Sequence, residues 1–322
     1  MKRWYKLDNA AKVFPSVSNE ENSAVYRVSA ILTEEINPEI LQKAVNHIYD
    51  RCAMFFVRLG KGLFWYYLDS NEQRFVIEEE KRYPCRQMHY KTTKGYMIRV
   101  LYHHKRISVE VFHSLADGGG ALELLKSLIY YYLIFSGKTI NHENSIILAE
   151  SSIDPEETDD SFSRYYKHYE KNQLEQSKYD PKEKAYPLRG TKFPNGGVHV
   201  TTGIVTASDL NRIAKEKGTT LTGYVTALLL YSIYETRLKY ERSNRPAMAA
   251  LPVSMRKIFP SGTLRNFFIV IMIGQKMNKE VTLDELIQMV SNGMKEQTTK
   301  EYLQYRLFVI GKYDKVRFNK VV

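Results

Sequence analysis

Apolar and polar positions in the first part of the chain follow the periods of both strands and helices, which predicts a mixed α and β structure. Residues 24–33 alternate and predict a strand. Residues 38–48 place apolar side chains on one helical face, after Asn37 as the N-cap and with Pro38 at the first helical position. The aromatic run 63–68 predicts a further strand, one face of which would line either the core or an apolar tunnel.

A second group of elements lies in the middle of the chain. Residues 96–103 and 107–113 predict two strands joined at Lys105–Arg106, and residues 121–135 predict a strongly apolar helix. The stretch 138–197 is rich in Pro, Gly and charged residues. It therefore predicts a crossover or linker and not a packed element.

The rest of the chain predicts a second lobe of similar style. We expect a first lobe over 1–137, the crossover over 138–197 and the second lobe over 198–322. Strands and helices of the second lobe are predicted, in chain order, at 198–205, 208–218, 220–233, 247–253, 267–273 and 282–294. Apolar runs without alternation are typical of strands covered on both faces. The fold class expected from both halves is α/β, with mixed sheets and flanking helices.

Composition narrows the class of protein. The chain has 322 residues, 43% of them hydrophobic, which is enough to build the cores of two ordinary domains. Its two cysteines, Cys52 and Cys85, cannot form a disulfide framework or a structural zinc site. No uncharged apolar run approaches the roughly 18 residues that cross a bilayer, and the N-terminus lacks the apolar core of a signal peptide. We expect no membrane span and a reducing, cytoplasmic location.

Positive charge is concentrated in the second half of the chain. Residues 1–180 contain 24 Lys and Arg against 25 Asp and Glu, whereas residues 181–322 contain 23 against 11. A basic half indicates either an anionic partner or a solvated lysine-rich surface, because charge governs association and solubility rather than fold. No basic run or nucleic-acid motif accompanies the charge, so nucleic acid is not the expected partner.

The segment Ser108–Ala121 carries the strongest indication of chemistry. A predicted strand ends at His113, a short loop carries Asp117, and glycines 118–120 precede an apolar helix. An imidazole has an unperturbed pKa of about 6.5, so at a fixed strand end it can take a proton from a hydroxyl, amine or thiol near pH 7. The glycines allow a turn and the close approach of a substrate.

These residues also allow other interpretations. A His followed four residues later by Asp-Gly arises by chance in roughly 3% of chains of this composition, so a surface histidine beside a turn stays open. The glycines lack the spacing of known phosphate-binding loops. No metal site is expected from His89, His103, His104 and His113, because adjacent histidines on a strand point to opposite faces and no nearby Cys or Glu completes a ligand set.

The stretch His113-Ser-Leu-Ala-Asp117-Gly118 matches the HxxxDG signature of the chloramphenicol acetyltransferase-like acyltransferases. That superfamily includes the condensation domains of peptide synthetases and the alcohol acetyltransferases. Other segments resemble its alcohol acetyltransferase-like branch in order and spacing. They are Trp4–Asp8 with Phe14-Pro15, Arg51–Leu59 with Gly62–Trp65, and Leu251–Arg256 with Leu264–Phe268. The resemblance covers most of the chain.

This resemblance implies a two-lobe fold of the CoA-dependent acyltransferase type, with a tunnel between the lobes. Compared with that family, the second lobe of this chain is expected to be shorter than usual. His113 would be the general base that deprotonates the acceptor. Gly118 would keep the tunnel open beside the histidine, and Asn266 would help to join the strands around the site.

The resemblance also assigns a role to the aspartate of the motif. Asp117 would be structural, pointing away from the substrate and pairing with an arginine. Arg256 is the arginine expected first, and Arg58 and Arg51 come after it.

The function implied is transfer of an acyl group from a thioester to the hydroxyl or amine of a small acceptor, with acyl-CoA as co-substrate. A thioester is already activated, so catalysis needs proton removal and positioning, and no metal or bound cofactor is expected. The basic residues of 181–322 would receive the phosphates of CoA. The alternatives are a catalytically silent binding or interaction module, a truncated condensation-type domain, and a basic nucleic-acid binder.

Overall fold

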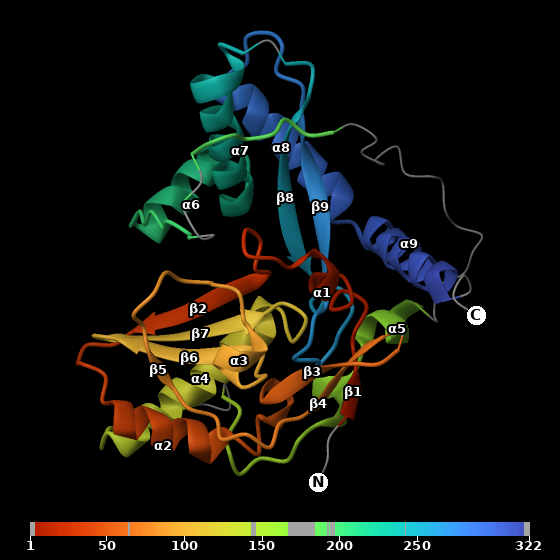
Figure 1. Ribbon diagram of the computed structural model, residues 1–322. Helices are drawn as coiled ribbons and strands as arrows, with labels where there is room; N and C mark the ends of the chain where they lie inside the picture. Colours follow the sequence, from red (N-terminus) through yellow and green to blue (C-terminus); the bar gives the residue numbers. More distant parts are fainter. Residues whose placement is uncertain are drawn as a thin grey trace. The chain divides into compact units, whose positions relative to one another are not determined.

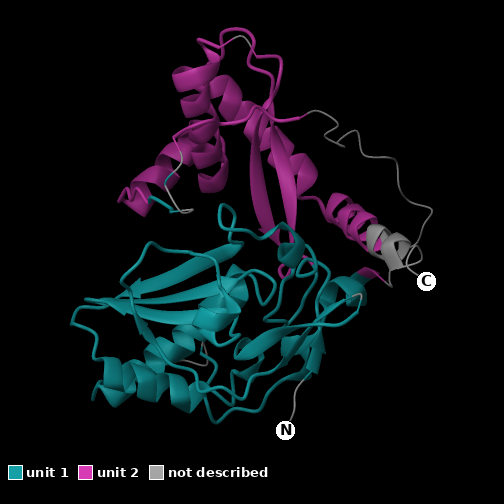
Figure 2. Ribbon diagram, viewed as in Figure 1, with its two compact units in different colours: residues 1–165, 192–199, 259–267 teal, residues 166–191, 200–258, 268–322 magenta. Residues whose placement is uncertain are grey.

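The chain forms two compact units, each built from several segments (Figures 1 and 2). The computed structural model describes residues 4–63, 65–142, 146–166, 184–191, 193, 197–241 and 243–318, with side chains as far as residue 311. Unit 1 comprises residues 1–165, 192–199 and 259–267, and unit 2 comprises residues 166–191, 200–258 and 268–322. The predicted lobe boundaries stay a prediction. Periodicity did not predict that residues 259–267 belong to unit 1.

Unit 1 contains two sheets. The first has the order β2-β7-β6-β5, in which β5 runs parallel to β6 and the other pairs are antiparallel. The second has the order β1-β4-β3 and is antiparallel throughout. The strands are β1 (Trp4–Lys6), β2 (Val25–Ile31), β3 (Val57–Lys61), β4 (Tyr66–Ser70), β5 (Glu78–Glu79), β6 (Ile98–His103) and β7 (Arg106–Phe112).

Two long helices cover the first sheet, and they pack against each other. Asn37 caps the first of them by accepting hydrogen bonds from the N–H groups of Glu39 and Ile40, as predicted. The second begins at Gly118, three residues earlier than predicted, because Asp117 caps it. The helices and helical turns of unit 1 are α1 (Phe14–Val17), α2 (Pro38–Ile48), η1 (Ala53–Phe55), α3 (Tyr90–Thr93), α4 (Gly118–Phe135), η2 (Pro155–Thr158) and α5 (Ser161–Tyr166).

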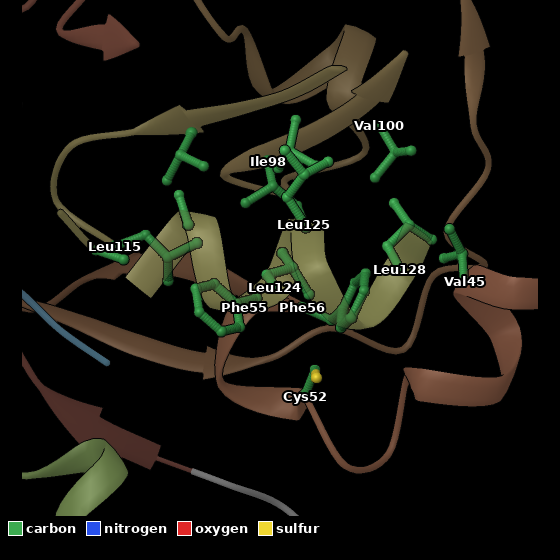
Figure 3. Close-up of a cluster of buried hydrophobic side chains, with 14 of the residues drawn as sticks. Val45, Cys52, Phe55, Phe56, Ile98, Val100, Leu115, Leu124, Leu125 and Leu128 are labelled. Atoms are coloured by element: carbon green, nitrogen blue, oxygen red, sulfur yellow. The ribbon is translucent and has the colours of Figure 1, made fainter. Parts of the chain in front are cut away.

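The core of unit 1 lies between these helices and the sheet (Figure 3). Leu124 and Leu128 of α4 are almost fully buried against strand residues such as Ile98 and Val100. Complete burial of a side chain of this size contributes about 1.5–3 kcal/mol. Cys52 belongs to the same cluster, and burial raises the pKa of its thiol to about 12, so it is not a nucleophile.

Two expectations for unit 1 need correction. The strand predicted at 63–68 begins only at Tyr66, and Phe64 lies outside the described residues. The stretch 138–197 is not a linker throughout, because residues 146–165 belong to unit 1 and Phe162 is buried there. Residues 143–145, 167–183, 192 and 194–196 of that stretch lie outside the described residues.

Unit 2 contains a two-stranded antiparallel sheet, β8 with β9, against which α7 and α8 pack. Thr220 and Thr282 cap these two helices through their side chains, as the predicted starts require. The elements are α6 (Ala207–Glu216), α7 (Leu221–Ile233), the π-helical turn η5 (Tyr234–Leu238), β8 (Ala247–Ser254), β9 (Phe268–Gln275), α8 (Leu283–Gln297) and α9 (Lys300–Phe318).

Two expectations for residues 198–322 were wrong, and one helix of this range was not predicted. Residues 198–205 form no strand, because this segment pairs with no strand among the described residues and Ile204 is 95% exposed. Strand β9 is buried on one face and only half-buried on the other. Helix α9 was not predicted, because its apolar and charged residues are spread around the helix instead of forming one face. Within the described residues, no helix is both long and apolar enough to cross a membrane.

Candidate active site

His113 follows directly after β7, as the sequence predicted. Its backbone N–H donates to the carbonyl oxygen of Ala24 over 2.9 Å, which extends the β2–β7 pairing by one residue. The loop that follows ends at Asp117, where α4 begins. The sheet therefore fixes the backbone of this histidine, and the loop leaves its side chain half-buried.

Two aromatic rings hold the imidazole in place. Phe14 of α1 stacks on it, with ring centroids 4.4 Å apart and an interplanar angle of 9°. Tyr26 of β2 lies 4.8 Å away at a tilt, and its hydroxyl donates to the carbonyl oxygen of Ala116. Sequence reasoning missed Tyr26, and it noted Phe14 only as part of a motif.

Asn266 fixes the hydrogen-bonding state of the imidazole. Its Oδ1 lies 3.1 Å from His113 Nδ1, while its Nδ2 lies 3.0 Å from the His113 carbonyl oxygen and 3.2 Å from Asp8 Oδ2. Two acceptors therefore face Nδ2, which assigns the amide orientation. Because Oδ1 is an acceptor, Nδ1 of the neutral ring carries the proton and Nε2 carries the lone pair.

Burial lowers the pKa of His113 below its ordinary value of 6.5. The hydrogen bonds to its own carbonyl and to Asn266, and the charge of Asp117, oppose this shift but do not cancel it. The imidazole is consequently neutral at pH 7. A neutral imidazole with its lone pair on Nε2 has the protonation state of a general base.

Asp117 ties the start of α4 to the segment 259–267. Its Oδ1 accepts from the N–H groups of Gly119 and Gly120 at 3.1 and 3.2 Å, and its Oδ2 accepts from the N–H of Phe267 at 2.9 Å. The aspartate of the motif thus holds in place the segment that carries Asn266.

The sequence predicted an arginine partner for this aspartate, with Arg256 first and Arg58 and Arg51 after it. Arg51 and Arg58 form their ion pairs elsewhere, with Glu157 at 2.6 Å and with Asp69 at 2.7 Å, so neither takes that role. Arg256 lies in unit 2, and its pairing stays a prediction.

Two of the three glycines that begin α4, the exposed Gly118 and the buried Gly120, differ in what surrounds them. A Cβ atom added to Gly120 would lie 1.9 Å from the carbonyl oxygen of Leu264, so only glycine allows this close approach. A Cβ atom added to Gly118 would meet nothing within 4 Å. Packing therefore requires glycine at position 120 but leaves open space beside position 118.

Asp8 and Arg265 complete the site, and sequence reasoning gave neither of them a role. Asp8 is fully buried, with its Oδ1 accepting from the N–H of Ala11 and its Oδ2 lying 3.5 Å from Arg265 Nη2. Burial raises the pKa of Asp8 to about 6, and the attraction of Arg265 only partly offsets it. Asp8 and Arg265 both lie in segments that resemble the acyltransferase family, and this resemblance was the only feature of the sequence that pointed to them.

A cavity of about 300 Å³ opens in unit 1 beside Phe112. Tyr66, Tyr90, Tyr96 and Met97 are among the residues that line it. No three His, Cys, Asp or Glu side chains of the described residues gather in a way that would hold a metal ion.

Solved structures of similar fold cover nearly the whole chain. Polyketide synthase associated protein 5 from Mycobacterium tuberculosis matches with a TM-score of 0.62 at 14% identity, over 93% of this chain and 74% of its own. A variant of the starter condensation domain of rhizomide synthetase, in complex with C8-CoA, matches with 0.56 at 13%, over 96% and 74%. The SgcC5 protein from Streptomyces globisporus matches with 0.55 at 11%, over 95% and 76%.

The chain has the fold of condensation domains. Its mixed α/β architecture, with several sheets and flanking helices, agrees with the fold class expected from the sequence. No protein-family model matches the sequence, and no curated protein matches it either.

Proposed function

We propose that the chain is an acyltransferase that moves an acyl group from acyl-CoA to the hydroxyl or amine of a small acceptor, with His113 as general base. The observation that carries this proposal is the hydrogen bond between His113 Nδ1 and Asn266 Oδ1, which leaves the lone pair on Nε2. A base is the group that this reaction most needs, because the thioester is already activated.

In the proposed reaction the acyl group passes directly from the thioester to the acceptor, without a covalent enzyme intermediate. Nε2 of His113 takes the proton of the acceptor as its oxygen or nitrogen attacks the thioester carbonyl carbon. The tetrahedral species then expels the CoA thiolate, and the imidazolium returns its proton to that sulfur. The products are the acylated acceptor, free CoA and neutral His113.

Two neighbours of similar fold support the choice of substrates. One was solved in complex with C8-CoA, and another in complex with an aromatic ethanediol. A CoA thioester as donor and an alcohol as acceptor are the classes that these ligands represent. The alcohol acetyltransferase-like motifs favour ester formation over amide formation.

Gly118 and the basic second half would serve the two substrates. The open space beside Gly118 would leave room for the acceptor to approach the imidazole. The positive charge of residues 181–322 would attract the phosphates of CoA. Reversing the charge of the exposed Lys257, Lys279 and Lys295 should raise the KM for acyl-CoA several-fold, and an unchanged KM would remove this part of the proposal.

The test is acceptor-dependent release of CoA thiol. Acetyl-CoA and octanoyl-CoA are each incubated with a panel of small alcohols and amines, and free thiol is followed over time. The wild-type protein is compared with His113→Ala and with His104→Ala, which removes an exposed histidine from the β6–β7 turn.

We expect His113→Ala to lower kcat/KM by about 10²-fold or more and His104→Ala to leave it unchanged. Equal thiol release by all three proteins, or none by any, would contradict the proposal and favour a silent binding module. A nucleic-acid binder would instead show salt-dependent retention on DNA.

A further inference from the structure

Asp8 is a buried carboxylate that the proposed reaction does not use. It lies in the loop between β1 and α1 and is fully buried. Its Oδ1 accepts from the N–H of Ala11 at 2.8 Å, and its Oδ2 accepts from Asn266 Nδ2 at 3.2 Å. Through Asn266 it is one residue removed from the imidazole of His113.

The orientation of the Asn266 amide decides which nitrogen of His113 carries the proton. In the observed orientation Oδ1 faces His113 Nδ1, so the ring is protonated there. In the reversed orientation Nδ2 would donate to Nδ1, and the proton would move to Nε2. When Nε2 carries the proton, it has no lone pair with which to take a proton from the acceptor substrate. Only the observed orientation of the amide therefore leaves His113 able to act as a base.

We propose that Asp8 is a positioning residue, whose carboxylate, together with the carbonyl oxygen of His113, keeps the Asn266 amide in the orientation that leaves the lone pair on His113 Nε2. This inference rests on the proposed function. Ionised Asp8 has only acceptor atoms, so it repels Oδ1 of a reversed amide and attracts Nδ2. A protonated Asp8 can donate to Oδ1, which permits the reversed amide and the unproductive tautomer.

The charges around Asp8 are consistent with this role. Arg265, from the segment 259–267, faces it at 3.5 Å and favours the ionised form. Asp160, next to the start of α5, disfavours that form, as does burial. These opposing influences place the titration of Asp8 at a pH of about 6, close to that of a histidine. The productive tautomer is therefore sensitive to pH between about 5 and 7.

The variant that tests the proposal is Asp8→Asn. The N–H of Ala11 requires an acceptor, so the new side chain must turn its oxygen there and its NH₂ group toward Asn266. That NH₂ group favours Asn266 with Oδ1 toward it. The carbonyl oxygen of His113 still accepts from Asn266 Nδ2 in the observed orientation, so the two influences oppose each other in the variant. We therefore expect the fraction of neutral His113 that is protonated on Nε2 to rise.

The measurement is ¹⁵N NMR of histidine-labelled protein without substrate, at pH 8. In the wild type, His113 should show a protonated Nδ1 and a bare Nε2, and in Asp8→Asn the fraction of the Nε2–H form should be clearly higher. The matched control is Asp69→Asn, which removes a carboxylate of β4 that pairs with Arg58 of β3 and should leave the tautomer ratio unchanged. An Nε2–H tautomer in the wild type, or an unchanged tautomer ratio in folded Asp8→Asn, would overturn the proposal.

Steady-state kinetics provide a second measurement, because a residue with a purely structural role would not change kcat and the pH profile in the way expected here. We expect Asp8→Asn to lower kcat several-fold with KM within about twofold of the wild type. The acid limb of the wild-type pH profile should have a slope above 1, because both His113 and Asp8 must lose a proton, and a slope of 1 in the variant. The NMR result needs no substrate, so it stands apart from any failure of the proposed function. If the variant does not fold, the His113 tautomer of the wild type and the slope of the acid limb of its pH profile still test the proposal.

Discussion

Unit 1 contains two buried groups of charged side chains that are built in opposite ways. On the first sheet, Arg27, Glu110 and Arg99 stand opposite one another across β2, β7 and β6. Glu110 accepts hydrogen bonds from both arginines over 2.5–3.1 Å. At the site, Asp8 has its arginine, Arg265, only at 3.5 Å.

The difference appears in the pKa values of Asp8 and of Glu80, an acid next to the sheet group that pairs with Arg27 at 2.8 Å. Burial would raise the pKa of Glu80 beside the sheet group, but hydrogen bonds from Arg106 and Arg27 lower it below its ordinary value. Burial raises the pKa of Asp8 to about 6, because its pairing is looser. Close pairing fixes a charge for stability, whereas loose pairing leaves a group that titrates near neutral pH, as is frequent at functional sites.

Breaking the sheet group should have the largest effect on stability. Glu110→Gln leaves Arg99 buried without its countercharge, while Arg27 keeps its ion pair with Glu80, and we expect the free energy of unfolding to fall by about 3–5 kcal/mol. Both tryptophans, Trp4 and Trp65, lie in unit 1, so tryptophan fluorescence in a urea titration reports its unfolding. A loss below about 1 kcal/mol would show that the group is not a structural one.

The pH dependence of stability sharpens the comparison at Asp8. Its pKa is about 6 in the folded protein and 3.8 as the ordinary value, so the folded state holds the proton more tightly. The stabilisation is fully present below pH 4 and is lost as the pH rises through about 6, by about 3 kcal/mol in total. The stability advantage of wild type over Asp8→Asn should fall by this amount between pH 4 and pH 7. A constant difference over that range would contradict the looser pairing.

The glycines of α4 separate packing from access within the site. Gly120→Ala forces the backbone at Leu264 to move, and we expect a loss of about 1–3 kcal/mol in the urea titration. Gly118→Ala should change stability by less than about 0.5 kcal/mol and lower kcat/KM about tenfold. Unchanged activity in Gly118→Ala would mean that the space beside it is not used by substrate.

The smallest effect is expected at an exposed ion pair. Arg58 is 44% exposed and pairs with Asp69 at 2.7 Å, a distance as short as those of the sheet group. Arg58→Ala should nevertheless cost less than about 1 kcal/mol, because solvent screens the pair. A loss as large as that of Glu110→Gln would show that pairing distance, and not burial, governs these groups.

Much of the fold followed from local patterns. Asn37, Thr220 and Thr282 cap helices where the sequence predicted, because capping depends on a few neighbouring residues. The prediction of a strand at 198–205 was wrong, because a local pattern does not provide the neighbouring strand with which a strand must pair. Helix α9 was missed because no apolar face identifies it.

The site followed only in part. The strand-loop-helix pattern placed His113 and Asp117, since these depend on neighbours in sequence. Asn266 was named through the resemblance, but its bond to the imidazole joins residues 153 positions apart, which no local pattern contains. The role of Asp8 is more distant still, because its contact with Asn266 spans 258 positions.

The central claim is that His113 accepts the proton during direct acyl transfer, and a single-turnover experiment tests it most directly. Wild type and His113→Gln are mixed with octanoyl-CoA and an accepted alcohol, and both the ester and the intact protein mass are followed after rapid quenching. The account predicts ester formation at least about 10²-fold slower in His113→Gln and no acyl group on either protein. Equal rates in the two proteins, or an acylated wild-type protein on the path to ester, would contradict it.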